Sequence, residues 1–230
     1  MVILVKAIAI DGPAGAGKST IARAVAQAMG YIYVDTGALY RAIGLGVCLL
    51  GLDPHNEKDV TDALDSITVT LRFVEGEQRV FLNGHDVSGE IRQPQISMAA
   101  SQVASIGAVR EFLFSLQKDM AKKNNVVMDG RDIGTVVLPQ ADVKIFLTAS
   151  PEERAQRRYD ELMLKGEKTT YEEVLADVKQ RDYNDTHRDI SPLRQAQDAI
   201  LVDTTGITLE QSIQKVHDTA VQKLSTQTSC

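Results

Sequence analysis

A glycine-rich stretch near the start of the chain has the spacing of a phosphate-binding loop. Residues 12–19 have the sequence G-P-A-G-A-G-K-S, which matches G-x-x-x-x-G-K-S. In such a loop, backbone N–H groups and the start of the next helix attract phosphate oxygens, Lys18 reaches the β- and γ-phosphates, and the Ser19 hydroxyl binds Mg²⁺. We therefore expect a nucleoside triphosphate to be held by Gly12, Pro13, Ala14, Gly15, Ala16, Gly17, Lys18, Ser19 and Thr20.

The elements on either side of this loop are those that a phosphate site requires. An apolar run over residues 2–10 predicts a buried strand before it. Residues 21–29 have helical spacing that ends at Gly30, which we expect to be a C-terminal cap. A glycine-rich turn formed by chance would lack these flanking elements, so that alternative is disfavoured.

A carboxylate follows a second apolar strand. Residues 126–128 precede Asp129, and Gly130, Arg131 and Asp132 come directly after it. In open α/β sheets the carboxyl ends of the strands border the ligand crevice, so Asp129 would lie beside the phosphate loop and hold Mg²⁺ with Ser19. The alternative is an ordinary Asp-Gly turn at a strand end, and the adjoining charged pair favours the metal site.

Arginines gather in the last third of the chain. They are Arg154, Arg157, Arg158, Arg181, Arg188 and Arg194. Most lie on two predicted helices that flank residues 165–168, an arrangement typical of a lid that closes over transferring phosphates and excludes water. Guanidinium groups suit phosphate oxygens, although each arginine taken alone could equally belong to a solvated face paired with Glu152, Glu153 or Glu161.

Composition excludes several classes of protein. The 230 residues carry a formal net charge of −6, which disfavours bulk nucleic-acid binding. Cys48 and Cys230 form neither a disulfide framework nor a metal pattern, and we expect Cys48 to be a small core residue. The first apolar run is too short to span a membrane and has no cleavage site, so we expect a cytoplasmic protein. The histidines, for which we expect surface or packing roles, have no metal or triad partner at suitable spacing: His55, His85, His187 and His217.

Alternating elements predict an α/β fold. Short apolar strands are expected at residues 2–10, 31–34, 126–128, 143–147 and 199–202. Helices are expected at 38–50, 109–122 and 152–164, after the capping-box spacing at Thr170, and after Thr208. This alternation predicts a five-stranded parallel sheet with helices on both faces. The tail after Lys223 is expected to be frayed.

One stretch interrupts the alternation. Residues 68–74 and 79–82 have strand patterning around a turn, which predicts an antiparallel hairpin. A hairpin does not belong within a doubly wound sheet, so we expect residues 51–105 to be an inserted subdomain. The remaining division is a core over 1–50, 106–150 and 189–230, with a lid over 151–188.

Taken together, the motifs resemble the bacterial cytidylate kinases, a family of P-loop nucleoside monophosphate kinases. The stretches that carry the resemblance are Ile10-Asp11-Gly12-Pro13, Asp35-Thr36-Gly37-Ala38-Leu39-Tyr40-Arg41, Val87-Ser88-Gly89-Glu90-Ile91-Arg92, Ala100-Ser101-Gln102-Val103, residues 129–137, and Arg181-Asp182 through Asp185 to Arg188. The resemblance implies the strand order 2-3-1-4-5, an insertion that binds the monophosphate, and transfer of the ATP γ-phosphate to CMP and dCMP with Mg²⁺.

The resemblance also implies roles for individual residues. Arg41, Arg131 and Arg188 match positions around the acceptor phosphate, and Arg181 and Asp185 match those near the ribose. The cytosine is implied to contact Ser101, Arg110 and Asp132, with Thr36 nearby, where some members have Ser. ATP would also meet Arg157 and Arg158, and the catalytic set would be Lys18, Asp129, Arg131 and Arg188. A dedicated general base is not expected, because a phosphate monoester is already anionic at neutral pH.

Three other functions are compatible with a phosphate-binding loop. A P-loop kinase for a different small molecule is the nearest. A GTP-dependent switch is disfavoured because the chain lacks an N-K-x-D motif, and a nucleic-acid-binding ATPase is disfavoured by the acidic composition. We expect small-molecule substrates, no nucleic-acid or membrane partner, and a monomer.

Overall fold

The core of the protein is a parallel sheet. The structure is a computed structural model that describes residues 5–74 and 77–228. Within these residues five strands form the sheet: β1 (Ala7–Asp11), β2 (Ile32–Asp35), β6 (Val126–Gly130), β7 (Val143–Thr148) and β8 (Ile200–Asp203). Their order is β2-β6-β1-β7-β8, which is 2-3-1-4-5 when only strands of this sheet are counted; the labels differ because β3–β5 belong to another sheet.

The strands are short and apolar, and β1, β2, β6 and β7 are mostly buried, as their sequences predicted; β8, at the edge of the sheet, is not, because Val202 is its one buried residue. β1 begins at Ala7, so part of the predicted run lies in the strand, while residues 2–4 lie outside the described residues. Ile10 and Asp35 both lie in register with Asp129, on β1, β2 and β6 respectively. The parallel pairing therefore brings the acidic carboxyl ends of three neighbouring strands to one edge.

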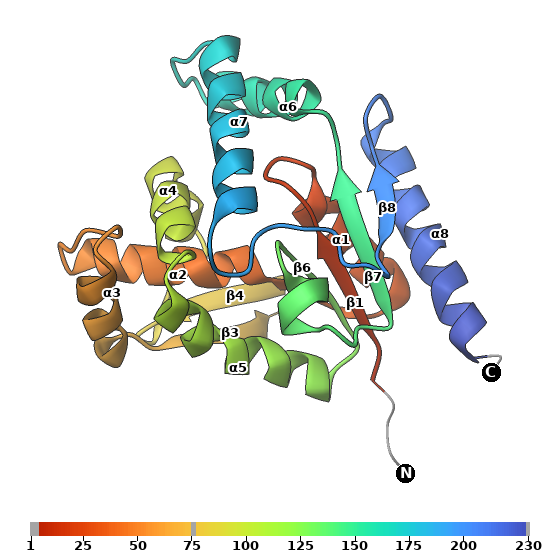
Figure 1. Ribbon diagram of the computed structural model, residues 1–230, viewed down its shortest axis with the longest axis horizontal. Coiled ribbons are helices and arrows are strands. Elements are labelled where there is room, and N and C mark those ends of the chain that lie inside the picture. The colour runs from red at the N-terminus through yellow and green to blue at the C-terminus, as the bar shows by residue number, and fades with distance from the viewer. Residues whose placement is uncertain (1–4, 75–76, 229–230) are drawn as a thin grey trace.

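Helices cover both faces of the sheet, as predicted (Figure 1). On one face α1 (Lys18–Met29) and α8 (Leu209–Thr228) pack against β1 and β7. On the other, α5 (Gly107–Lys123) and the short η3 (Ile133–Val137) pack against β1, β2 and β6. The frayed tail after Lys223 was a wrong prediction, because α8 continues through Thr228 and Leu224 packs on the core; residues 229–230 lie outside the described residues.

The predicted hairpin is present and belongs to a small second sheet. In the described part of the chain this sheet has three antiparallel strands in the order β3-β4-β5: β3 (Val69–Val74), β4 (Glu77–Leu82) and β5 (His85–Asp86). β4 starts two residues earlier than predicted, because Val74 pairs with Glu77 across the turn.

Short helices complete this region. They are α3 (Glu57–Ala63), η1 (Leu64–Ser66), η2 (Glu90–Arg92) and α4 (Pro94–Val103). They share a hydrophobic cluster with α2 (Thr36–Leu49) and the start of α5. A Cβ at Gly44 would stand 3.0 Å from the Ala100 nitrogen, so α2 and α4 approach closely because position 44 is glycine. The boundaries 51 and 105 of the insertion stay a prediction, since its core continues into α2 and α5.

Cys48 corrects one prediction. It lies on the last turn of α2 and is exposed, not buried in the core. Leu49 and Leu50 beside it are also exposed. The apolar composition of this helix suggested complete burial, but its packed surface ends at Val47.

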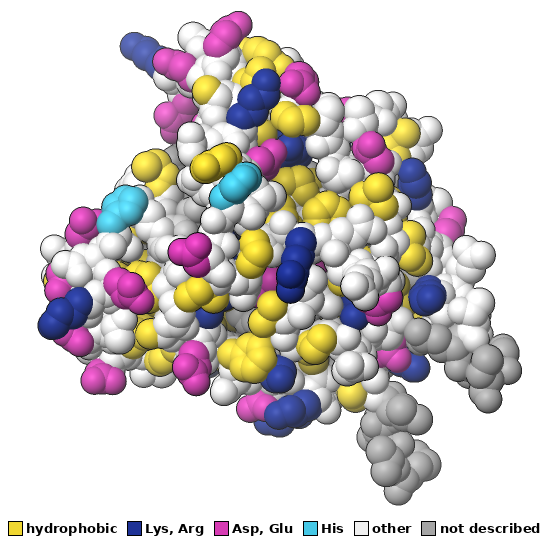
Figure 2. Space-filling model, in the orientation of Figure 1, with side chains coloured by type: hydrophobic (Ala, Val, Ile, Leu, Met, Phe, Trp, Pro, Cys, Tyr) yellow, Lys and Arg dark blue, Asp and Glu magenta, His cyan; other side chains and the backbone are white. Residues whose placement is uncertain are grey.

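The lid region is a pair of packed helices above the carboxyl edge of the sheet (Figure 1). α6 (Pro151–Leu164) and α7 (Tyr171–His187) share a small cluster of Ala155, Val174 and Val178. The predicted capping box is confirmed: the Thr170 hydroxyl accepts from the Glu173 N–H, and the Glu173 carboxylate accepts from the Thr170 N–H. On the face shown in Figure 2, acidic and basic side chains are interspersed over the body and the lid.

Among residues 5–74 and 77–228, no helix combines the length and the apolarity that a membrane crossing requires.

Candidate active site

The phosphate loop is a tight turn between β1 and α1. Gly12 has φ 153°, and a Cβ there would stand 1.9 Å from the Leu147 carbonyl oxygen, so only glycine fits. Gly17 is left-handed at φ 83° and caps α1. Lys18 opens the helix, is 6% exposed, and donates from Nζ to the Pro13 carbonyl at 2.7 Å. Its ammonium group therefore lies across its own loop, where phosphate oxygens would take over as partners.

Burial has the largest effect on the pKa of Lys18. Desolvation lowers the pKa of Lys18, and the nearby Arg131 guanidinium lowers it further, while the carboxylates of Asp129, Asp185 and Asp11 oppose both effects. Bringing a polyanionic phosphate chain to this place would stabilise the charged ammonium.

Asp129 and Ser19 meet as predicted. The Ser19 hydroxyl donates to Asp129 Oδ2 at 2.9 Å, the Tyr33 hydroxyl donates to Oδ1 at 3.0 Å, and the Thr36 hydroxyl donates to the Asp129 carbonyl at 2.7 Å. Burial raises the pKa of Asp129, and the nearby Asp35 raises it further. A cation beside these carboxylates would offset that cost.

The donors present suit Mg²⁺. Hydroxyl and carboxylate oxygens are its preferred protein ligands, and it usually keeps several waters and binds substrate phosphates. Among the described residues no cluster of three or more His, Cys, Asp or Glu side chains could hold a metal by itself. Ser19 and Asp129 therefore fit a metal that arrives with the nucleotide.

Asp11 holds the loop that follows β6. Its Oδ1 accepts from the Ile133 N–H and its Oδ2 from the Gly134 N–H, each at 2.7 Å. Burial raises the pKa of Asp11 to about 6, while these two hydrogen bonds lower it. The carboxylate thereby fixes the backbone beside Arg131 and Asp132.

Arg131 and Arg110 each pair with an acid that is itself a predicted substrate residue. Arg131 Nε donates to Asp185 Oδ2 at 2.7 Å, which joins the end of β6 to α7. Burial would raise the pKa of Asp185, but the guanidinium groups of Arg131 and Arg188 outweigh it and hold the pKa below its usual value. Arg110 on α5 pairs with Asp132, and its Nη1 also donates to the Ala104 carbonyl at 3.1 Å.

Arg188 lies near Arg110 and Asp185, and within the described residues it keeps an unused hydrogen-bond donor. Its Nε donates to the Ser191 carbonyl at 2.8 Å, and within the described residues its buried Nη2 has no hydrogen-bond partner. Burial lowers the pKa of Arg188, and Arg110 lowers it further. A buried cation with an unused donor suits an incoming anion.

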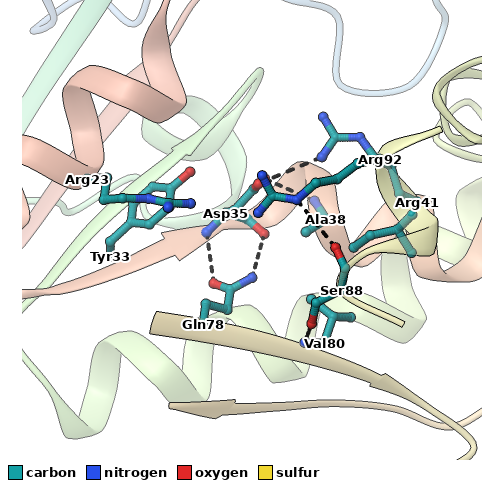
Figure 3. A pocket seen from close by; sticks show the side chains of 10 residues that line it. Arg23, Tyr33, Asp35, Ala38, Arg41, Gln78, Val80, Ser88 and Arg92 are labelled. Carbon is teal, nitrogen blue, oxygen red and sulfur yellow. Dashed lines mark hydrogen bonds and ion pairs between the residues drawn. The ribbon is translucent and has the colours of Figure 1, made fainter. Parts of the chain in front are cut away.

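A basic pocket lies beside β2, at the junction with the small sheet. Arg41 Nη1 stands 3.7 Å from Asp35 Oδ2. In Figure 3 the Arg41 guanidinium points toward the Asp35 carboxylate, and Arg92, which lines the same pocket, donates to the Ser88 carbonyl at 3.3 Å. Gln78 exchanges two hydrogen bonds with the Asp35 backbone, which ties the small sheet to β2.

Other predicted residues are not gathered into the site. Ser101 is exposed on α4 and, in the described part of the chain, makes no hydrogen bond to Arg110 or Asp132. Arg181 pairs with Asp177 and Arg158 with Glu161, within their own helices.

Arg157 and Arg154 lie nearer the phosphate loop, and they differ in how many contacts hold each guanidinium group. Arg157 pairs with Glu153, and its Nη1 stands 3.9 Å from where a Cβ at Gly17 would be. Arg154 is 2% exposed and donates to the carbonyls of Ala149 and Ala14 and to Asp182. It joins α6 and α7 to the phosphate loop as a structural brace, and its grouping with phosphate-binding arginines stays a prediction.

A sequence model described as cytidylate kinase matches residues 8–222. The chain belongs to the cytidylate kinase family. A cytidylate kinase of Caldicellulosiruptor bescii is 52% identical over 209 residues, covering 91% of this chain and 92% of that protein. One of Caldanaerobacter subterraneus is 51% identical over 223 residues, covering 97% of each.

The solved structures that resemble this chain support its fold and nothing more specific. The crystal structure of an uncharacterized protein from Eubacterium ventriosum has a TM-score of 0.50 and 11% identity, and covers 93% of this chain and 96% of that one.

Sequence reasoning missed four residues of this cytidylate kinase site. Asp11 and Arg92 lay in motifs that were recognised but received no role. Arg23, which lines the pocket of Figure 3 with its guanidinium carbon 5.4 Å from the centre of the Tyr33 ring, was not singled out. Tyr33 was hidden within an apolar strand. Its position two residues before the acidic end of β2 was the available signal, because alternate strand residues share a face.

Proposed function

We propose that the chain transfers the γ-phosphate of ATP to CMP and dCMP, giving CDP and dCDP. The observation that best supports this proposal is the buried Arg110–Asp132 pair at the sheet edge that also carries the phosphate loop. It places a carboxylate and a guanidinium beside each other, which is the complement of the polar edge of cytosine.

The triphosphate would occupy the loop over residues 12–20. Lys18 would exchange the Pro13 carbonyl for β- and γ-phosphate oxygens and follow the transferring group into the transition state. Ser19 and Asp129 would hold Mg²⁺. That ion would neutralise charge on the β- and γ-phosphates. Arg157, which already lies over Gly17, would meet the nucleotide, with Arg158 on the same helix face.

The acceptor phosphate would lie among arginines from three elements. Arg131 and Arg188 stand beside the Asp185 carboxylate, and Arg41 enters from α2. Because the phosphate of CMP is already anionic at neutral pH, catalysis requires positioning and charge neutralisation and no general base.

The base would be read by its pattern of donors and acceptors. The amino group of cytosine would donate to Asp132, and its N3 and O2 would accept from Arg110. Ser101 would approach as α4 closes, and Thr36, at the start of α2, already lies beside the end of β6. Uracil presents O4 and an N3–H at the same places, so it would leave both buried groups mispaired.

The lid would complete the site. Closure of α6 and α7 would bring Arg181 and Asp185 to the ribose and exclude water, which otherwise competes for the γ-phosphate. We propose that the protein acts as a monomer on small-molecule substrates in the cytoplasm.

Labelled ATP tests this function directly. With [γ-³²P]ATP, Mg²⁺ and CMP, the purified protein should transfer label to CDP, and with dCMP to dCDP. Release of labelled phosphate alone would mark an ATPase, and label in a product of AMP or shikimate but not of CMP would assign another kinase.

A further inference from the structure

A cavity of about 280 Å³ lies beside Arg110, next to the pair that we propose reads the base. It is bounded by α5, the end of η3, one side chain of α2 and the segment after the lid. Its lining residues include Tyr40, Arg110, Glu111, Phe114, Gln117 and Ile190. Arg110 therefore has an ion pair with Asp132 and, in addition, borders a cavity lined mainly by uncharged groups, the carboxylate there being the exposed Glu111.

Tyr40 forms the part of this wall that contacts Arg110. The guanidinium carbon of Arg110 stands 5.6 Å from the centre of the Tyr40 ring. A cation at this distance from an aromatic ring is attracted by the ring, more strongly where water is excluded. Burial raises the pKa of Tyr40 and Arg110 lowers it, which places the two groups in the same electrostatic environment.

Arg110 makes two kinds of contact: its terminal nitrogens pair with oxygens, and its guanidinium group lies near the Tyr40 ring. Nη2 pairs with Asp132 and Nη1 donates to the Ala104 carbonyl, so both terminal nitrogens are engaged at the edge of the guanidinium. The Tyr40 ring adds an attraction that uses none of the N–H donors. It can therefore hold the guanidinium in place while the donors exchange one acceptor for another.

Gln117 supports the tyrosine. It lies two helical turns along α5 from Arg110, is 2% exposed, and lines the same cavity. In the described part of the chain its amide nitrogen has no hydrogen-bond partner, and the Gln117 side chain lies near enough to Tyr40 to oppose the rise in the Tyr40 pKa. A buried donor without a partner costs stability, so a functional role would account for its presence.

We propose that Tyr40 and Gln117 position Arg110 and thereby set the preference for cytosine over uracil. Neither contacts the substrate; Gln117 steadies the Tyr40 hydroxyl and the Tyr40 ring steadies the guanidinium. The inference rests on the proposed function, because it assumes that Arg110 donates to the base.

Three variants test the tyrosine. Tyr40→Leu removes the ring and should lower kcat/KM for CMP by roughly tenfold, with a much smaller loss for UMP. Tyr40→Phe keeps the ring and removes only the hydroxyl that Gln117 steadies, so the CMP-to-UMP ratio should fall by no more than roughly threefold, as in Gln117→Met. Phe114→Leu is the matched control, because Phe114 lines the same cavity but contacts Lys118, whose Nζ stands 4.3 Å from its ring centre. It should leave the ratio unchanged.

Gln117→Met gives an independent readout. It keeps the volume and removes the unpartnered donor, so thermal stability should be equal or higher, whereas the CMP-to-UMP ratio should fall by roughly threefold. A merely structural glutamine would show no change in the ratio.

The outcomes separate this inference from the proposed function. Wild-type protein that does not prefer CMP to UMP overturns the proposed function. If the wild-type protein prefers CMP and Tyr40→Leu has the same CMP-to-UMP ratio, the role of Tyr40 is refuted and the proposed function is not. If Tyr40→Leu does not fold, Gln117→Met decides: an unchanged ratio refutes the inference.

Discussion

Replacing Asp132 by Asn tests the proposed recognition of the base at constant side-chain volume. Asp132 is 4% exposed and Arg110 is 9% exposed, so the substitution leaves a buried guanidinium without its counter-charge. Removing one partner of a buried pair costs about 3–5 kcal/mol. Since Asn keeps an oxygen that can accept from Arg110, we expect a smaller loss of about 2 kcal/mol in the free energy of unfolding.

The kinetic effect should depend on the base. An Asn side chain can present its amide nitrogen where Asp132 presented an acceptor, so kcat/KM for CMP should fall by roughly 10²-fold, about 2.7 kcal/mol in the barrier. The same amide can donate to O4 of uracil, so UMP activity should fall much less or rise.

An assay that couples ADP release to NADH oxidation, run with CMP and with UMP, measures this difference. Asp182→Asn is the matched control: it weakens the pair with Arg154, which is also buried, but in the lid. It should lower both activities by similar factors. If the CMP-to-UMP ratio of Asp132→Asn equals that of the wild type, Asp132 does not read the base, even if total activity collapses.

Three further variants probe the frame around this site. Lys18→Ala should abolish transfer while leaving the circular dichroism spectrum unchanged, and turnover within about tenfold of wild type would contradict its role at the γ-phosphate. Asp11→Asn puts an amide nitrogen against one of two backbone N–H groups and should lower the free energy of unfolding in urea by about 1–3 kcal/mol; no loss would show that Asp11 does not hold that loop. The folded pKa of Asp185 lies below the usual 3.8, so its pairing adds stability above that pH, and the stability is lost as pH falls through the folded pKa. The difference in Tm between wild type and Asp185→Asn should therefore be present at about pH 6 and shrink below about pH 4; a difference that does not change with pH would contradict this pairing.

Features encoded locally were predictable from the sequence. The phosphate loop, the glycine cap at Gly30 and the capping box at Thr170 each depend on residues within a few positions of one another. Four strands of the main sheet, β1, β2, β6 and β7, were recognisable because both faces are largely covered, which leaves short continuous apolar runs, and the edge strand β8 was recognisable from its apolar sequence although it is mostly exposed. Burial at the end of a helix is less local, and Cys48 was misplaced for that reason.

Contacts between distant segments were not predictable in this way. Asp11 meets Ile133 at a separation of 122 residues, and Tyr33 meets Asp129 at 96. Arg154 follows the same pattern, since its contact with Ala14 depends on how the lid meets the phosphate loop. The sequence showed only that these arginines are close together in the chain. The fold shows that Arg154 braces the phosphate loop, whereas others lie beside the site.

The specificity constant for a panel of monophosphates tests the central claim most directly. With ATP and Mg²⁺ in excess, kcat/KM should be highest for CMP and dCMP and lower by at least tenfold for UMP and AMP. The proposed site predicts this order because Asp132 and Arg110 would match the amino donor and the N3 and O2 acceptors of cytosine, whereas uracil reverses the first two positions and adenine lacks an acceptor equivalent to O2. An equal or higher kcat/KM for AMP or UMP would contradict the account.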